Sequence, residues 1–178
     1  MEVAAAEKLA LEKGFSNVSH LDVSTMELLD EVRAMCSANT CGQYGKNWAC
    51  PPACGELEEC RARISRFREG ILVQTVGDIE DSLDFEAMME IEAEHKAHFM
   101  EAAEELRKEF PELLAIGAGC CTICAKCAYP DGPCRFPDKR VSSLEAYGIV
   151  VSELCKKNNL AYYYGADKIA YTSCFLLK

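Results

Sequence analysis

The residues best suited to chemistry are the 12 cysteines of this 178-residue chain. Cys121, Cys124 and Cys127 follow one another at intervals of three, and Cys134 comes soon after them. Three thiolates with this spacing on a curling loop can each reach a different iron of one [4Fe–4S] cluster, as in bacterial ferredoxins. We therefore predict a ferredoxin-like cysteine loop over residues 120–137, with Cys134 as the nearest candidate for the fourth ligand.

A second group of candidate ligands comprises Cys36, Cys41, Cys50 and Cys54. These residues lie in a segment rich in Gly, Asn and Pro, and we take residues 36–60 as a first cysteine loop and the helix that follows it. The spacing of these cysteines is less regular than that of the second loop. Cys50, however, directly precedes two prolines, as a ligand precedes proline in ferredoxins. We expect a second cluster here; a separate zinc site or a contribution to the other centre are the alternatives.

The remaining cysteines have plainer interpretations. Cys60, Cys155 and Cys174 fall in predicted helices or strands, so we expect core thiols. Cys120 directly precedes Cys121, and vicinal cysteines rarely both ligate one centre. The sequence therefore gives Cys120 no role in the second loop.

Other side chains near the cysteines could tune a cluster. Tyr44 and Trp48 lie within the first loop and could shield a cluster from water. The second loop is surrounded by basic residues, which are Lys126, Arg135, Lys139 and Arg140. These are either ordinary surface charges or groups that offset the negative charge of a cluster and raise its potential.

A carboxylate and an imidazole fall on one side of a long predicted helix, at Glu92 and His95. This spacing occurs in di-iron helical bundles, but such a site needs several carboxylate-bearing helices and only one is visible. We expect a satisfied Glu–His pair at the edge of the core or a solvated helix face, with a proton-relay or ligand role for His95 as the less favoured interpretation.

The composition limits the function classes. The net charge is −10, and the acidic excess lies in the first 119 residues. Phosphate contacts need a basic face, so we expect no nucleic-acid partner. The first 15 residues contain no continuous apolar segment of the kind that a secretory signal requires, and no stretch is long and apolar enough to span a bilayer. We expect a cytoplasmic protein without a membrane partner, in which clustered cysteines hold metal more often than disulfides.

Two motifs resemble a known family. They are CGQYGKNWACPP from Cys41 to Pro52 and CTICAKCAYPDGPCRFP from Cys121 to Pro137, the latter extended by SSLEAYGIVVSELC to Cys155. Together they resemble the predicted metal-binding family known as domain of unknown function 2284, along most of the chain. The resemblance implies metal binding of the iron–sulfur type and implies no particular reaction.

Apolar periodicity predicts an α+β fold in a single domain, residues 1–178, with a small mixed sheet, flanking helices and two cysteine-rich metal-binding loops. A capping box at Ser24 and Glu27 predicts a helix that ends at Cys36. The predicted helices cover 2–13, 57–67, 83–110 and most of 142–158; the predicted strands cover 15–21, 71–76, 113–116, 160–164 and 169–177, with the last two as a hairpin. The strand–helix–strand order over 71–116 resembles a crossover unit.

These observations favour a cytoplasmic iron–sulfur protein with one or two [4Fe–4S] clusters that exchanges single electrons with a redox partner protein. No dinucleotide, P-loop or nucleophile-elbow motif is present. An enzyme in which an open cluster iron acts as a Lewis acid is one alternative. A zinc-stabilised scaffold is the other.

Overall fold

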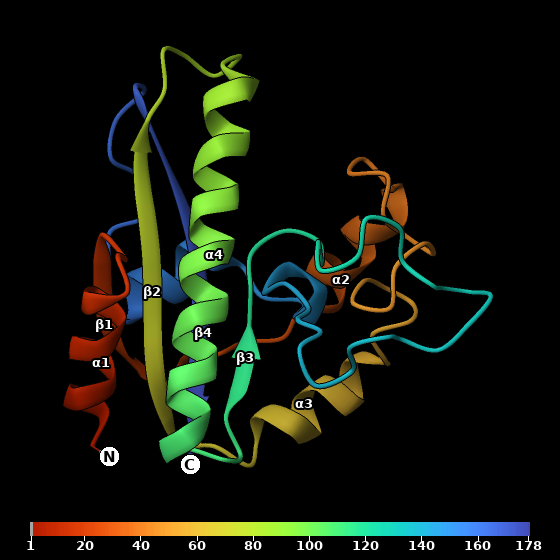
Figure 1. Ribbon diagram of the computed structural model, residues 1–178, viewed down its shortest axis with the longest axis horizontal. Helices are drawn as coiled ribbons and strands as arrows, with labels where there is room; N and C mark the ends of the chain where they lie inside the picture. The colour runs from red at the N-terminus through yellow and green to blue at the C-terminus, as the bar shows by residue number, and fades with distance from the viewer. Residues whose placement is uncertain (1) are drawn as a thin grey trace.

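A four-stranded sheet forms the centre of the computed structural model, which describes residues 2–178, and helices lie on both of its faces (Figure 1). The α-helices are α1 Val3–Glu12, α2 Asp30–Met35, α3 Leu57–Ile64, α4 Phe85–Glu109 and α5 Val151–Lys157. The strands are β1 Asn17–Asp22, β2 Glu69–Asp78, β3 Leu114–Ile116 and β4 Lys168–Leu177, and short 3₁₀ turns are η1 Val23–Thr25, η2 Cys36–Ala38 and η3 Glu145–Tyr147. None of the helices within 2–178 is both long and apolar enough to cross a membrane.

The strand order is β1-β2-β4-β3, and each neighbouring pair is antiparallel. Because β2 and β3 both run opposite to β4, they run parallel to each other with β4 between them. The predicted strand–helix–strand unit is therefore present, but it is split by the C-terminal strand. The α+β class with flanking helices is confirmed. The strand ladders are antiparallel rather than mixed, and the parallel pairing is one bridge between Gly117 and Ser143.

The two central strands are buried on both faces because each face carries its own core. Side chains alternate along a strand, so Ile71 and its partner Phe175 point toward α1 and α4. Leu72 and its partner Cys174 point to the opposite face, where they pack with residues of α3 and α5. This arrangement explains the uninterrupted apolar runs of β2 and β4.

The three core thiols predicted from the sequence are confirmed. Cys60, Cys155 and Cys174 are fully buried in the cluster beneath α3 and α5. Burial raises the pKa of Cys155 and Cys174 above the ordinary thiol value. Cys155 and Cys174 are therefore neutral packing groups near neutral pH.

The predicted start of the second helix is wrong. The side chain of Asp22 accepts the N–H of Ser24 at 2.9 Å and caps the short turn η1, and helix α2 begins only at Asp30. Asp22 is a stronger cap than the Ser24–Glu27 box because its carboxylate receives both the amide and the hydroxyl of Ser24. The expectation that this helix ends at Cys36 is confirmed, since α2 ends at the preceding residue.

The predicted C-terminal hairpin is also wrong. Residues 160–164 form no strand, and β4 instead pairs with β2 along its whole length. The side-chain Nε2 of Gln74 donates to the carbonyl of Ala161 at 2.8 Å. The hydroxyl of Tyr164 donates to the side-chain Oε1 of Gln74 at 2.7 Å. The segment is therefore fixed to the sheet through side chains instead of a strand ladder.

His95 of α4 is fully buried between the helix and the sheet. Its Nδ1 lies 2.9 Å from the hydroxyl of Thr75, and its Nε2 lies 2.7 Å from the hydroxyl of Ser173. The expected Glu–His pair is absent among the described residues, because Glu92 forms an ion pair with Lys96 instead. Burial lowers the pKa of His95 to about 3, so the ring is neutral in the folded protein.

We predict that His95 makes the free energy of unfolding depend on pH. An unfolded histidine takes up a proton below about pH 6.5, whereas the folded ring stays neutral until about pH 3, so stability falls as the pH drops through this window. Between pH 7.5 and pH 5 the expected loss is about 2 kcal/mol by linkage. Urea titrations followed by circular dichroism measure it.

The variant His95→Gln should have a lower free energy of unfolding and should lack this part of the pH dependence. His20→Gln is the matched control, because His20 is about half exposed. A His95→Gln protein with the same pH slope as the wild type would contradict the prediction.

Candidate metal centre

The second cysteine loop leaves the sheet at the end of β3 and returns beside its own starting point. The amide of Gly117 donates to the carbonyl of Ser142 at 2.9 Å, and the amide of Leu144 donates to the carbonyl of Gly117 at 3.0 Å. Leu144 is fully buried and anchors the returning chain in the core. Residues 118–141 therefore project from the sheet as one loop closed at its base.

The four predicted ligands of this loop surround one small pocket. Its walls are formed by Cys121, Cys124, Cys127 and Cys134, together with Asn47, Trp48, Ile123, Phe136 and Arg140. The structure thus brings together the four thiols that the spacing singles out, and their ligation of metal stays a prediction.

Cys127 receives hydrogen bonds that favour its thiolate. The backbone N–H of Trp48 donates to Cys127 Sγ at 3.4 Å. Burial raises the pKa of this thiol, but the amides of Tyr129, Trp48 and Ala128 and the charge of Arg135 outweigh burial and place the pKa below the ordinary value. A thiolate is the form that binds metal, so this environment suits a ligand.

The first loop, which follows α2, contacts the second loop, and Figure 1 shows both loops on the same side of the sheet. Asn47 Nδ2 donates to the carbonyl of Cys121 at 3.2 Å, while its Oδ1 accepts the amide of Ala49 at 2.9 Å. Trp48 Nε1 donates to the carbonyl of Gly132 at 2.9 Å. Its ring also packs edge-on against Tyr129, with centroids 4.9 Å apart. Trp48 thus lines the pocket of the second loop, a contact that spacing within the first loop does not reveal.

The thiols of the first group gather around Cys50. Burial raises the pKa of Cys50 to about 12, and the neighbouring thiols of Cys120, Cys41, Cys54 and Cys36 add to this increase. Burial also raises the pKa of Cys36, and the thiol of Cys41 adds to this increase. These four thiols thus lie close enough to Cys50 to influence its pKa, and their ligation of metal stays a prediction.

Cys54 differs from the other three, because it is buried with the core thiol Cys60 between two arginines. Burial raises its pKa, and the charge of Arg33 opposes that shift. Arg63 donates to the carbonyl of Cys54 and to the hydroxyl of Tyr147, each at 3.0 Å.

Arg33 donates in the same way to the carbonyls of Gly55 and Ala146, the latter at 2.7 Å. The two arginines, Arg33 and Arg63, thus join the end of the first loop to η3. Sequence reasoning missed both, since charged residues on short helices give no signal for a structural clamp.

The basic residues of the second loop have separate roles. Arg140 lines the thiol pocket, and Arg135 donates to the carbonyl of Lys126 at 2.9 Å within the loop. Lys139 instead forms an ion pair of 2.7 Å with Glu104 on α4. Two positive charges therefore stay near the thiols, and one fastens the loop to the long helix.

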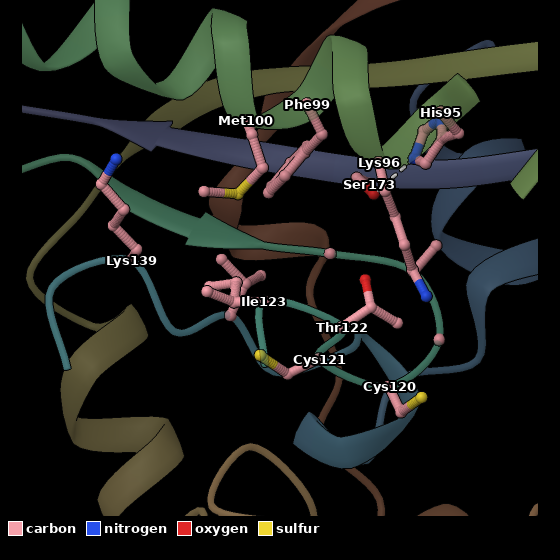
Figure 2. Close-up of a pocket in the computed structure, with 14 residues that line it drawn as sticks. His95, Lys96, Phe99, Met100, Cys120, Cys121, Thr122, Ile123, Lys139 and Ser173 are labelled. Atoms are coloured by element: carbon pink, nitrogen blue, oxygen red, sulfur yellow. Dashed lines mark hydrogen bonds between the residues drawn. The ribbon is translucent and has the colours of Figure 1, made fainter. Parts of the chain in front are cut away.

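A second pocket lies between α4 and the second loop (Figure 2). Its lining includes the His95–Ser173 pair on one side and the vicinal cysteines on the other. Figure 2 shows the side chains of Cys120 and Cys121 pointing in opposite directions. Consecutive cysteines thus present their thiols to different parts of the site.

Among residues 2–178, no three His, Cys, Asp or Glu side chains form a group that could hold a single metal ion. The donor set is nevertheless suited to a soft metal, because thiolates bind zinc, copper(I) and iron–sulfur clusters. The thiols of the second loop line a pocket, and an amide points at one of them.

The fold and the site together define a cysteine-rich α+β protein with two adjoining thiol-bearing loops. The family model described as predicted metal-binding protein (DUF2284) matches residues 19–177. The chain belongs to this family, which confirms the resemblance seen in the sequence motifs. Searches of curated proteins and of solved structures returned no match.

We predict that Asn47→Ala loosens the second loop although Asn47 belongs to the first. The variant loses the bond to the Cys121 carbonyl and leaves the buried amide of Ala49 without its acceptor, which costs about 1–3 kcal/mol. Hydrogen exchange in residues 120–137 should therefore accelerate.

Asn39→Gly is the matched control for Asn47→Ala. Asn39 accepts the amide of Tyr44 within the first loop, and glycine tolerates its left-handed backbone. Exchange in residues 120–137 should stay unchanged in this control. Equal exchange in both variants would show that the Asn47 contact does not hold the loops together.

Proposed function

We propose that this metal-binding protein is an iron–sulfur protein that carries one or two [4Fe–4S] clusters and passes single electrons to a redox partner protein. The observation that carries the proposal is the pocket lined by Cys121, Cys124, Cys127 and Cys134. These residues would hold one cluster, and the first-loop thiols would hold the second.

The arrangement of the thiols favours a cluster over a zinc ion. Four thiolates around one zinc converge on a point, with Zn–S distances of about 2.3 Å and sulfur atoms about 3.8 Å from one another. The ligands of a [4Fe–4S] cluster each bond a different iron and so surround a space. Thiols that line a pocket and receive an amide N–H at Cys127 Sγ support the second arrangement.

A bound cluster supplies reversible one-electron chemistry, and the surrounding side chains would set its potential. Arg135 and Arg140 lie near the thiols, where positive charge stabilises the more negative reduced form. Trp48 covers one side of the pocket and limits access of water. Phe136 lines the same pocket and is 45% exposed, so it offers a partner a path close to the thiols.

The proposal places the protein in the cytoplasm, where thiols stay reduced until metal binds them. It assigns a protein as the electron partner. The acidic excess outside the second loop disfavours nucleic acid and anionic membrane surfaces as partners.

An enzymatic role is the second candidate, because the pocket beside Cys120 and Cys121 could admit a small molecule. In that case an iron without a fourth cysteine would act as a Lewis acid. The buried pair of His95 and Ser173 on the opposite wall would then face the substrate. A spectral change of the protein on addition of cyanide would favour this second role over electron transfer.

We predict that protein purified without oxygen is brown, absorbs broadly in the visible range, and contains iron and acid-labile sulfide in equal amounts. Metal and sulfide analysis measures this directly. Colourless protein with stoichiometric zinc and no sulfide would contradict the proposal and favour a zinc-stabilised scaffold.

Cys124→Ala removes one thiol from the pocket and should lower the iron content by up to about four atoms per chain. Cys174→Ala is its control, because Cys174 is fully buried in the core and should not touch metal. Equal iron content in both variants would contradict the assignment of the second loop.

A further inference from the structure

We propose that the groove between α4 and the second cysteine loop is the docking site of the redox partner, and that the partner places there an apolar helix face bordered by Lys or Arg. The inference rests on the proposed function and adds the docking surface and the chemistry of the partner. The lining of this groove includes Met89, Ala93, Ala97 and Met100 of α4 and Thr122 and Ile123 of the loop.

The first step is a row of apolar side chains on the outer side of α4. Phe85, Met89, Ala93 and Ala97 follow one another at intervals of four, which places them on one side of the helix, and Met100 continues the row. Phe85 is 63% exposed and Met89 is 70% exposed. Single exposed apolar residues are common, but a continuous row of them is typical of an interaction surface.

The second step is the shape of the groove. Figure 2 shows Lys96 and Met100 reaching from α4 toward Thr122 and Ile123 of the second loop. The cavity between these two walls has a volume of about 550 Å³. Its lining extends from Met89 to Met100, which is about three turns of helix. A groove of this length fits the apolar face of a second helix.

The third step is the charge along one edge of the apolar row. Glu86, Glu90, Glu94 and Glu101 each directly follow a member of the row, so they lie about a quarter of a turn further around the helix. All four side chains are exposed. Among residues 2–178, only Glu94 of these four has an ion-pair partner, which is His98 at 3.9 Å. The edge therefore carries unbalanced negative charge.

The lysines near the groove do not balance this charge. Lys96 is paired with Glu92 on the same helix, and Lys139 is paired with Glu104. Complementary charge steers a partner and fixes its orientation, so Lys or Arg beside the partner's apolar face would meet the acidic edge. Two copies of this chain that met along α4 would instead bring two acidic edges together, which disfavours a second copy as the occupant.

The fourth step connects the groove with the thiols. Ile123 lines both the groove and the pocket formed by the four thiols of the second loop. A partner seated in the groove is therefore separated from the proposed cluster by little more than this side chain. One electron would leave the reduced cluster and reduce an oxidised centre of the partner, and no bond would form or break.

The test uses two synthetic helical peptides with the same leucine face, one bordered by lysines and the other by glutamates. Isothermal titration calorimetry with full-length protein purified without oxygen should show binding of the lysine peptide alone. The affinity should fall as the salt concentration rises, because salt screens the exposed charges. Iron and sulfide are measured in the same samples.

Met89→Ser and Glu90→Lys should each weaken binding of the lysine peptide by about tenfold, because one removes an apolar anchor and the other reverses a charge at the edge. Met89 is largely exposed, so its replacement leaves the core intact. Glu109→Lys is the matched control, since it makes the same charge change on an exposed residue at the end of α4, outside the groove. It should bind the peptide as the wild type does.

Equal binding by the wild type, Met89→Ser and Glu90→Lys would overturn the inference, and so would equal binding of the two peptides. A wild-type dimer that Met89→Ser dissociates in size-exclusion chromatography would assign the groove to a second copy and would also overturn it. In each of these cases, iron and sulfide in the wild type would still support the proposed function. Wild-type protein without iron that binds the lysine peptide would contradict the proposed function alone.

Discussion

The contact between Asn47 and Trp48 of the first loop and the backbone of the second loop is the interaction on which the candidate metal centre depends. Apart from the short turn η2, neither loop contains a helix or strand, so their backbone polar groups need partners elsewhere. Asn47 and Trp48 bond to the carbonyls of Cys121 and Gly132, and Trp48 also donates its own amide to Cys127 Sγ. Each loop thus completes the environment of the other.

The scaffold holds this pair of loops at three points. The bridge between Gly117 and Ser143 closes the second loop at the end of β3. Arg33 and Arg63 fasten the end of the first loop to η3. Lys139 joins the second loop to α4 through Glu104. The sheet and long helix therefore fix the loop ends, while the thiols occupy the irregular segments between them.

Local patterns were sufficient for much of the fold and for the second thiol group. The apolar runs of β2 and β4, the length of α4 and the regular spacing from Cys121 to Cys127 are all visible over a few residues. The strand order was not visible in such local patterns, because packing across the whole chain decides that β4 inserts between β2 and β3.

The surroundings of the first thiol group also depend on contacts between distant parts of the chain, which spacing in the sequence does not reveal. Cys54 is close to Cys50 in the sequence, whereas the influence of Cys120 on the pKa of Cys50 arises only from the tertiary fold. The directions of two neighbouring side chains depend on the turn at Gly119 and on the partner loop, so spacing alone does not determine them.

X-ray absorption at the iron edge of protein prepared without oxygen tests the central claim most directly. The account predicts iron with sulfur ligands and a second shell of neighbouring iron atoms, as in a cluster. Zinc as the bound metal, surrounded by four sulfur atoms at about 2.3 Å with no metal neighbour, would contradict it.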